Sequence, residues 1–181
     1  MKVEIERKFR ILDEGWRAQA SASSELRQGY IVMTKKRVVR VRTIDGAGAV
    51  LTVKIRTRSG RREEYEYVIP YDDATRMLDH ALCTIDKTRH EVEYRGFRWE
   101  IDVYHAMQEG LIIAEVELSA STDEPPLPPW LGPEITGNPK YSNRVLAKKG
   151  AAAHTDFPDV GRSGERLLTT MRRDVIFRPF D

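Results

Sequence analysis

Ionic side chains recur at every second position in most of the segments that resemble β-strands. The residues between them are mostly apolar, as in Arg40-Val41-Arg42 and in Glu115-Val116-Glu117. The ionic set contains eight cations and eight anions, namely Lys8, Arg40, Arg42, Lys54, Arg56, Arg62, Lys87 and Arg89, and Glu4, Glu6, Glu64, Glu66, Glu100, Asp102, Glu115 and Glu117. Because successive side chains of a strand point to opposite faces of its sheet, this spacing predicts that the set shares one face.

A face of this kind could bind a polyanion together with a metal ion. Arginine presents a planar fork of N–H donors that matches a phosphate group, and lysine acts as a compact positive charge. Clustered carboxylates supply the oxygen ligands that hard divalent cations prefer. A polyphosphate with its metal ion matches both halves of the set, and phosphoryl transfer is catalysed mostly by positioning and electrostatics.

Two interpretations of the ionic face differ in which side of the sheet points inward. In a conventional half-buried sheet the charges are solvated, and cross-strand ion pairs contribute a few tenths of a kcal/mol each. For a single pair, such as Lys87 and Arg89, this is the simpler interpretation. The size of the set favours a barrel with a charged lumen, and such a lumen should hold water and an ionic ligand because burying bare charges is costly.

The elements that position these residues are mainly strands. Alternation predicts strands at residues 3–9, 37–43, 50–56, 62–69, 87–94, 97–103 and 111–118, with residues 28–34 as an eighth. Short links containing Asp45-Gly46 and Ser59-Gly60 indicate antiparallel hairpins. Helical spacing is confined to residues 72–82 and 143–149, and the six prolines of residues 123–139 predict an extended or turning connection.

Composition narrows the class of protein. The 181 residues include 30 Lys and Arg and 28 Asp and Glu, and the net charge of +2 argues against a generic nucleic-acid binder. A single cysteine, Cys83, excludes an intramolecular disulfide, and no segment approaches the roughly 18 apolar residues of a membrane span. We therefore expect a cytoplasmic protein with no membrane or nucleic-acid partner. Residues 1–150 are expected to form one domain, followed by a C-terminal tail at 151–181 that could contain one short helix.

Several motifs occur together and in a definite order. The first is Glu4-Ile5-Glu6-Arg7-Lys8, an ExExK pattern. It is followed by Leu26-Arg27-Gln28-Gly29-Tyr30, Arg40-Val41-Arg42, Thr52-Val53-Lys54, Arg62-Glu63-Glu64-Tyr65-Glu66, Asp86-Lys87-Thr88-Arg89, Trp99-Glu100-Ile101-Asp102-Val103-Tyr104, Glu115-Val116-Glu117 and Lys140-Tyr141-Ser142-Asn143. In this set and order, over residues 1–150, the chain resembles the CYTH superfamily, the triphosphate tunnel metalloenzymes.

The resemblance implies an eight-stranded antiparallel β-barrel, flanked by a few helices, whose tunnel binds a triphosphate and Mg²⁺ or Mn²⁺. It implies that Glu4, Glu6 and Glu117 hold the metal that contacts the phosphates, and that Asp102 and Glu115 hold a second metal or the attacking water. Lys8 would also act in catalysis. The substrate-binding residues that it implies are Lys8, Arg40, Arg42, Lys54, Arg56, Arg62, Lys87 and Arg89, with Lys140 swinging over the tunnel.

Three further residues, Tyr30, Glu64 and Glu66, have less definite roles. Tyr30 either touches the terminal phosphate or gates entry as a catalytic residue, or it packs as a strand-end aromatic residue. Glu64 and Glu66 share the ionic face, and we expect them to neutralise neighbouring cations.

Within the family, the chain resembles the short bacterial inorganic tripolyphosphatases, including a Pro-Pro-Trp-Leu-Gly stretch before Lys140. The expected reaction is hydrolysis of tripolyphosphate, a small polyanion, to pyrophosphate and phosphate. The alternatives are a class IV-like adenylate cyclase, a thiamine triphosphatase, or a polyphosphate- or nucleotide-binding sensor without turnover. A homodimer is a further possible assembly.

Overall fold

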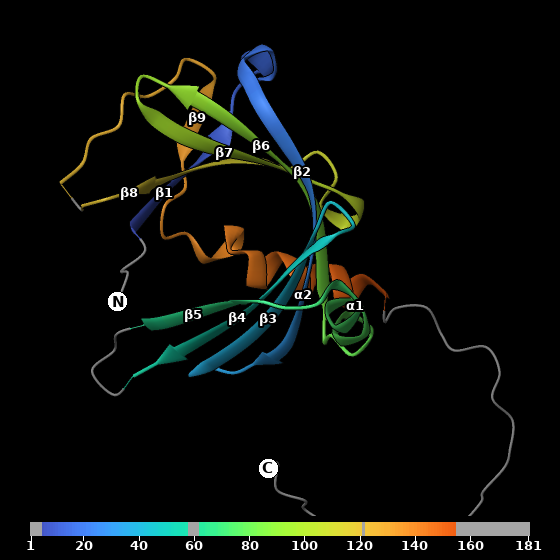
Figure 1. Ribbon diagram of the computed structural model, residues 1–181. Helices are drawn as coiled ribbons and strands as arrows, with labels where there is room; N and C mark the ends of the chain where they lie inside the picture. The colour runs from blue at the N-terminus through green and yellow to red at the C-terminus, as the bar shows by residue number, and fades with distance from the viewer. Residues whose placement is uncertain (1–4, 58–61, 121, 155–181) are drawn as a thin grey trace, which may run out of the picture.

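The computed structural model describes residues 5–57, 62–120 and 122–154 (Figure 1). Most of these residues belong to strands. The strands are β1 (Ile5–Ile11), β2 (Ala20–Met33), β3 (Arg37–Ile44), β4 (Gly48–Arg56), β5 (Arg62–Val68), β6 (Thr84–Tyr94), β7 (Phe97–Tyr104), β8 (Ile112–Leu118) and β9 (Leu131–Glu134). The helices are α1 (Tyr71–Asp79) and α2 (Asn143–His154), and short 3₁₀ turns are η1 (Glu14–Gln19), η2 (Ala106–Gln108) and η3 (Pro139–Tyr141).

All nine strands form one antiparallel sheet in the order β5-β4-β3-β2-β6-β7-β8-β1-β9. Figure 1 shows that the long strands β2 and β6 form a spine, from which β3–β5 curl to one side and β7, β8, β1 and β9 to the other. The two arms face each other across a concave space, and α2 runs between them. The predicted mainly β, antiparallel architecture with few helices is confirmed.

The sheet differs from the expected barrel in two details. It has nine described strands, and in the described part of the chain its edge strands β5 and β9 do not pair with each other, so hydrogen bonds do not close it. The ninth strand lies within the proline-rich segment that was expected to be an extended or turning connection. Pro133 is tolerated there because β9 is an edge strand and needs no second row of N–H donors.

The convex side of the sheet carries the apolar residues that alternate with the ionic set. Under one arm, Trp16, Trp99 and Trp130 are fully buried, and the rings of Trp99 and Trp130 meet edge to face with centroids 5.8 Å apart. Under the other arm, α1 covers β3 and β4 by packing Ala74 against Val41. These two clusters place most of the apolar core on the convex face, opposite the ionic residues.

Helix α1 approaches β2 so closely that only glycine fits between them. A Cβ atom at Gly29 would lie 2.7 Å from Cδ2 of Leu78 and 2.8 Å from Cβ of Ala81. Helix α1 is shorter than the predicted 72–82, because the N–H groups of His80 and Ala81 turn back to Met77 and Leu78. Helix α2 is longer than the predicted 143–149. No helix in the described ranges is long and apolar enough to cross a bilayer.

Candidate active site

The strand registers gather the ionic residues on the concave face. Lys8 lies opposite Glu115 and Glu6 opposite Glu117 across β1 and β8. The other pairs on this face are Glu100 with Glu115, Arg89 with Asp102, Arg42 with Gln28, and Lys54 with Glu64. The shared face predicted from the period-two spacing is therefore confirmed from Glu6 to Glu117. Glu4 lies outside the described residues.

Two cations and a carboxylate form the most buried ionic group of this face. Asp102 is 0% exposed and Lys87 is 1% exposed. Lys87 Nζ donates to Oδ2 of Asp102, and the guanidinium of Arg89 forms a bidentate pair with the same carboxylate, at 2.7 Å from Nε to Oδ1 and 2.8 Å from Nη2 to Oδ2. Buried charges are tolerated only when they are paired and hydrogen-bonded in this way.

Arg89 also links two further carboxylates. Its Nη2 lies 3.2 Å from Oε2 of Glu115, and its Nη1 donates to Glu100. Glu100 and Glu115 lie directly opposite each other on β7 and β8, where like charges would repel. Arg89 therefore neutralises a cluster of three carboxylates.

The pKa values in this cluster follow from burial and pairing. Burial alone would raise the pKa of Asp102, but Lys87 and Arg89 hold it at about 2, so the carboxylate stays ionised. Burial lowers the pKa of Lys87 to about 8, although Asp102 opposes the shift. Burial also raises the pKa of Glu100. For Arg89 burial is outweighed by Asp102, Glu100 and Glu115, which raise its pKa.

The β1 edge of the face is rich in carboxylate oxygens. Lys8 Nζ lies 2.7 Å from Oε1 of Glu115 and 3.1 Å from Oε1 of Glu6. Glu6 and Glu117 are cross-strand neighbours of like charge, an arrangement that a bound cation would stabilise. As arranged, no three Asp, Glu, His or Cys side chains among the described residues are grouped closely enough to hold a metal ion. The donor set nevertheless fits a hard divalent ion, because it consists of oxygens on neighbouring strands.

The opposite arm of the face contributes mainly cations. Arg40 Nη2 lies 3.1 Å from Oγ1 of Thr52 and 3.4 Å from Oε1 of Glu66. Lys54 Nζ lies 2.7 Å from Oε2 of Glu64, so both glutamates neutralise cations as expected. Burial, together with the neighbouring cations Arg40 and Arg89, lowers the pKa of Arg42 to about 10, although Glu66 and Asp102 oppose the shift. Arg56 is exposed, near the end of β4.

Helix α2 covers one end of the concave face. Its residues Leu146 and Ala147 are buried in a cluster with Tyr30, Ile85 and Ile113, all of which share the parity of the ionic residues. The hydroxyl of Tyr104 donates to Oδ1 of Asn143 at 2.7 Å, which fastens the start of α2 to β7. At this end, the ionic part of the face is therefore bordered by the apolar cluster under α2.

Two predicted site residues, Tyr30 and Lys140, lie apart from the ionic cluster. Tyr30 is 4% exposed in the apolar cluster under α2, and burial raises its pKa. Lys140 lies in the exposed turn η3, and no hydrogen bond or ion pair within the described ranges joins its side chain to the ionic cluster. Tyr104 and Gln28, which also face the concave side, were missed by the sequence analysis because neither carries a charge. Both belong to motifs that were singled out there, so their strand parity was the available signal.

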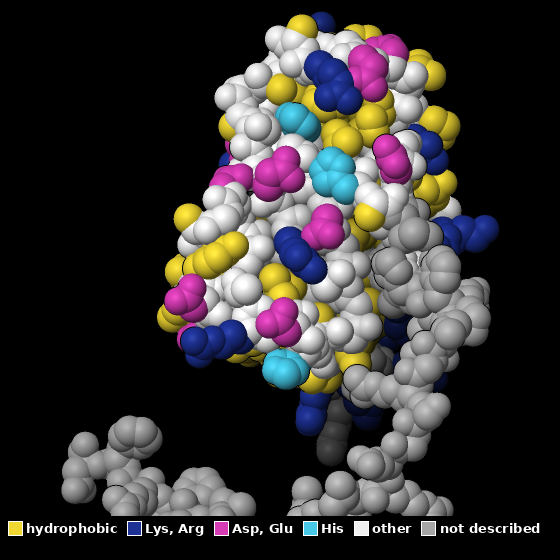
Figure 2. Space-filling view, turned by 90° about the vertical axis from the view of Figure 1, so that its right-hand side faces the viewer, with side chains coloured by type: hydrophobic (Ala, Val, Ile, Leu, Met, Phe, Trp, Pro, Cys, Tyr) yellow, Lys and Arg dark blue, Asp and Glu magenta, His cyan; other side chains and the backbone are white. Residues whose placement is uncertain are grey.

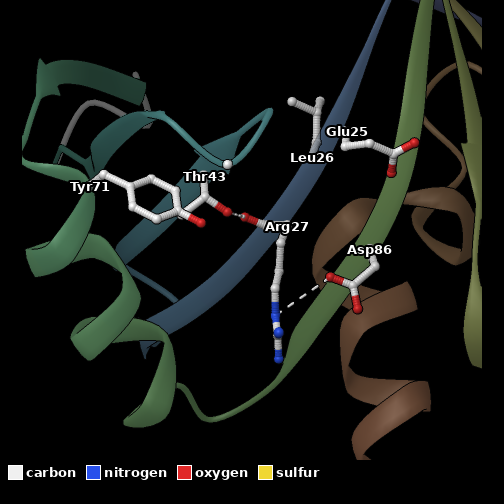
Figure 3. A pocket seen from close by; sticks show the side chains of 7 residues that line it. Glu25, Leu26, Arg27, Thr43, Tyr71 and Asp86 are labelled. Atoms are coloured by element: carbon white, nitrogen blue, oxygen red, sulfur yellow. Dashed lines mark hydrogen bonds and ion pairs between the residues drawn. The ribbon is translucent and has the colours of Figure 1, made fainter.

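A hollow of about 280 Å³ lies on the other side of the sheet (Figure 3). Arg27, Thr43 and Asp86, which line it, occupy the parity opposite to the ionic set, and Tyr71 closes it from the start of α1. The Nε of Arg27 and Oδ1 of Asp86 are 3.6 Å apart at its rim. In Figure 2 the visible face carries interspersed acidic and basic side chains without a continuous basic patch. Neither feature has the dense ionic packing of the concave face.

Comparison with known proteins agrees with this geometry. A family model described as the CYTH domain matches residues 2–144. The inorganic triphosphatase of Acetivibrio thermocellus is 40% identical over 151 residues, which cover 82% of this chain and 95% of that protein. The inorganic triphosphatase of Nitrosomonas europaea is 33% identical over 155 residues, covering 80% and 96%.

A solved structure has a similar fold. The crystal structure of an inorganic triphosphatase superposes with a TM-score of 0.61 at 28% identity, over 81% of this chain and 95% of that chain. The resemblance inferred from the motifs is therefore confirmed by both sequence and structure. The chain belongs to the CYTH domain family.

Proposed function

We propose that the chain is a divalent-metal-dependent hydrolase that cleaves inorganic tripolyphosphate to pyrophosphate and phosphate on the concave face of its sheet. The observation that carries the proposal is Arg42, which shares one face of β3 with Arg40 and whose buried Nε has no hydrogen-bond partner among the described residues. Burial, with Arg40 and Arg89, also lowers its pKa to about 10. A polyanion would add acceptor oxygens and negative charge beside Arg42, beyond what the neighbouring Glu66 supplies. The inorganic triphosphatases among the relatives support a triphosphate as that polyanion.

The cations of the face bind and orient the phosphate chain in this proposal. Those assigned to the substrate are Lys8, Arg40, Arg42, Lys54, Arg56, Arg62, Lys87 and Arg89, with Lys140 at the rim. Arginine forks fix the direction of individual phosphate oxygens, whereas the lysines neutralise charge as it shifts to the departing pyrophosphate. Tyr30, at the inner end of the face, limits how far the terminal phosphate can enter.

The carboxylates of β1 and β8 hold the metal in this proposal. Glu6 and Glu117, with Glu4, are assigned to the ion that contacts the phosphates, and Asp102 and Glu115 to a second ion or to the attacking water. Mg²⁺ or Mn²⁺, when bound, supplies charge neutralisation and a water of lowered pKa. Lys8 contacts Glu6 and Glu115 and so fixes their oxygens relative to each other.

The reaction consumes one water molecule for each anhydride bond. The water oxygen adds to a terminal phosphorus in line with the anhydride oxygen, the P–O bond breaks, and its electron pair leaves on pyrophosphate. The proton released from the water is accepted by a phosphate oxygen or by a carboxylate of the face.

A reducing compartment such as the cytoplasm suits the single cysteine, Cys83, which is buried.

The test is phosphate release from tripolyphosphate, ATP, thiamine triphosphate and pyrophosphate, each with Mg²⁺, Mn²⁺ or EDTA. We expect metal-dependent cleavage that favours tripolyphosphate, and loss of turnover in Glu6→Gln. Glu63→Gln is the matched control, because Glu63 lies opposite Ile55 on the other face of β5. Cyclic AMP formed from ATP would identify a cyclase instead, and tight tripolyphosphate binding without any product would identify a sensor.

A further inference from the structure

A neutral amide is buried among the cations of the concave face. Gln28 of β2 is 0% exposed, and neither its Nε2 nor its Oε1 has a hydrogen-bond partner among the described residues. Its register neighbours are Arg42 on β3 and Ile85 on β6, so its side chain shares the face of the ionic set. Buried amides are nearly always hydrogen-bonded, so this one calls for an explanation.

The adjacent arginines also contain buried nitrogen atoms without hydrogen-bond partners. The Nε atoms of Arg40 and Arg42 are also buried and have no hydrogen-bond partner among the described residues. Gln28 and Arg42 are direct cross-strand partners, and Arg40 is the next residue of β3 on that face. Three neighbouring side chains therefore present N–H donors without acceptors.

The described residues nearby offer few acceptors for these donors. Glu66 is engaged by Arg40 and by the hydroxyl of Thr52, and Asp102 is engaged by Lys87 and Arg89. A phosphate group brings only acceptors, with several oxygens in a compact volume. It therefore complements the donors of Gln28, Arg40 and Arg42 together, which an apolar or cationic ligand would not.

We propose that Gln28 is a substrate-binding residue whose Nε2 donates to an oxygen of the phosphate group held by Arg42. This inference rests on the proposed function, since it adds a neutral contact to the same site. The Oε1 of Gln28 is then available to accept from Nε of Arg42, which directs the terminal nitrogens of that arginine toward the phosphate. A methionine at position 28 would fill similar space but offer neither contact.

The experiment compares the wild-type chain with Gln28→Met and Gln28→Glu, and Gln19→Met serves as the control. Gln19 lies in η1 and donates to the Gly15 carbonyl, away from the concave face. We measure KM and kcat for tripolyphosphate with Mg²⁺, tripolyphosphate affinity by calorimetry in EDTA, and the melting temperature without ligand. Gln28→Met should raise KM and weaken binding about tenfold or more, with kcat within about twofold of wild type.

The melting temperature separates binding from packing. Gln28→Met should melt at or above the wild-type temperature, because an unpartnered buried amide is replaced by an apolar group of similar shape. Gln28→Glu should weaken binding further than Gln28→Met, since its carboxylate repels phosphate. Gln28→Glu also carries the test if the methionine variant does not fold.

The outcomes that overturn the inference differ from those that overturn the proposed function. Wild type that neither binds nor cleaves tripolyphosphate overturns both. An active wild type with unchanged KM and affinity in the Gln28 variants overturns the role of Gln28 alone. A lower melting temperature with wild-type KM in Gln28→Met identifies a packing residue and also overturns it. If wild type binds tripolyphosphate without cleaving it, unchanged affinity in the variants is the overturning result.

Discussion

Two half-buried arginines on the concave face, Arg89 and Arg42, differ sharply in their surroundings. Arg89 contacts Glu100, Asp102 and Glu115, whose charges raise its pKa. Arg42 lies beside other cations, and its pKa is lowered to about 10. The charge of Arg89 therefore stabilises the fold. The charge of Arg42 destabilises the fold unless an anion is bound beside it.

These surroundings predict opposite effects of the same substitution. Arg89→Met leaves buried carboxylates without their main partner, so we expect the free energy of unfolding to fall by about 3–5 kcal/mol. Arg42→Met should leave the free energy of unfolding unchanged or raise it, yet weaken tripolyphosphate binding at least about tenfold. Urea unfolding and calorimetry measure the two effects. Equal destabilisation by both substitutions would contradict this division of roles.

At the scale of elements, the short edge strand β9 supports β1. Arg7 of β1 forms a bidentate pair with Glu134 of β9, at 3.0 Å from Nε to Oε1 and 2.6 Å from Nη2 to Oε2. The backbone N–H of Ile135 donates to the carbonyl of Lys8 at 2.8 Å. Because β1 carries Glu6 and Lys8, β9 helps to position the edge of the site.

The Arg7–Glu134 pair predicts a stability difference in acid. The hydrogen bond from Arg7, with one from Thr136, lowers the pKa of Glu134 to about 2 from its ordinary value of 4.5. The stabilisation is therefore present above about pH 4.5 and is lost as the pH falls toward 2. Glu134→Gln should melt below wild type at neutral pH, and the difference in melting temperature should shrink as the pH falls from 4.5 toward 2. A gap that stays constant between pH 7 and pH 3 would show that the pair does not stabilise the fold.

At the scale of the whole molecule, α2 completes the concave face from within. Leu146 is 4% exposed and Ala147 is 0% exposed against the inner surface of the sheet. The prediction that residues 1–150 form the domain stays a prediction, and the short helix proposed for the tail lies outside the described residues. The burial of Leu146 and Ala147 nevertheless supplies a reason to expect that the domain needs its chain through this part of α2.

Truncation tests that organisation directly. A chain ending at His154 should keep the melting temperature and the tripolyphosphate kcat/KM of the full chain. A chain ending at Ser142 should unfold or aggregate, because it exposes the apolar cluster of Tyr30, Ile85 and Ile113. If the chain ending at His154 lost activity with an unchanged melting temperature, residues 155–181 would be needed for the reaction.

The charged face was predictable from the sequence because the period of a strand is two. The alternation of Glu115, Val116 and Glu117 assigns both glutamates to one face before any partner strand is known. The ion-pair partners were not predictable, since they depend on registers between distant strands, as for Lys8 and Glu115. Whether Arg89 contacts phosphate or carboxylates is likewise a matter of register.

Some elements gave too weak a signal to predict. Strand β2 begins at Ala20, well before the expected residue 28. Its start was missed because this Ser- and Ala-rich segment lacks apolar alternation. Pairing with β6 is what holds it in the sheet. Strand β9 was hidden by its prolines. Gln28 was missed because a neutral amide is inconspicuous among so many charges, and only its burial without partners singles it out.

The position of β1 in the sheet has a consequence for biosynthesis. Among the described residues this strand pairs with β8 and β9 alone, and its Lys8 meets Glu115 across 107 residues of chain. At about 5–20 residues per second, β1 waits on the order of 5–20 s for these partners to leave the ribosome. Such non-local pairing also slows refolding. The edge that carries Glu6 and Lys8 is therefore assembled last, and a nascent chain has no functional site until the sheet is nearly complete.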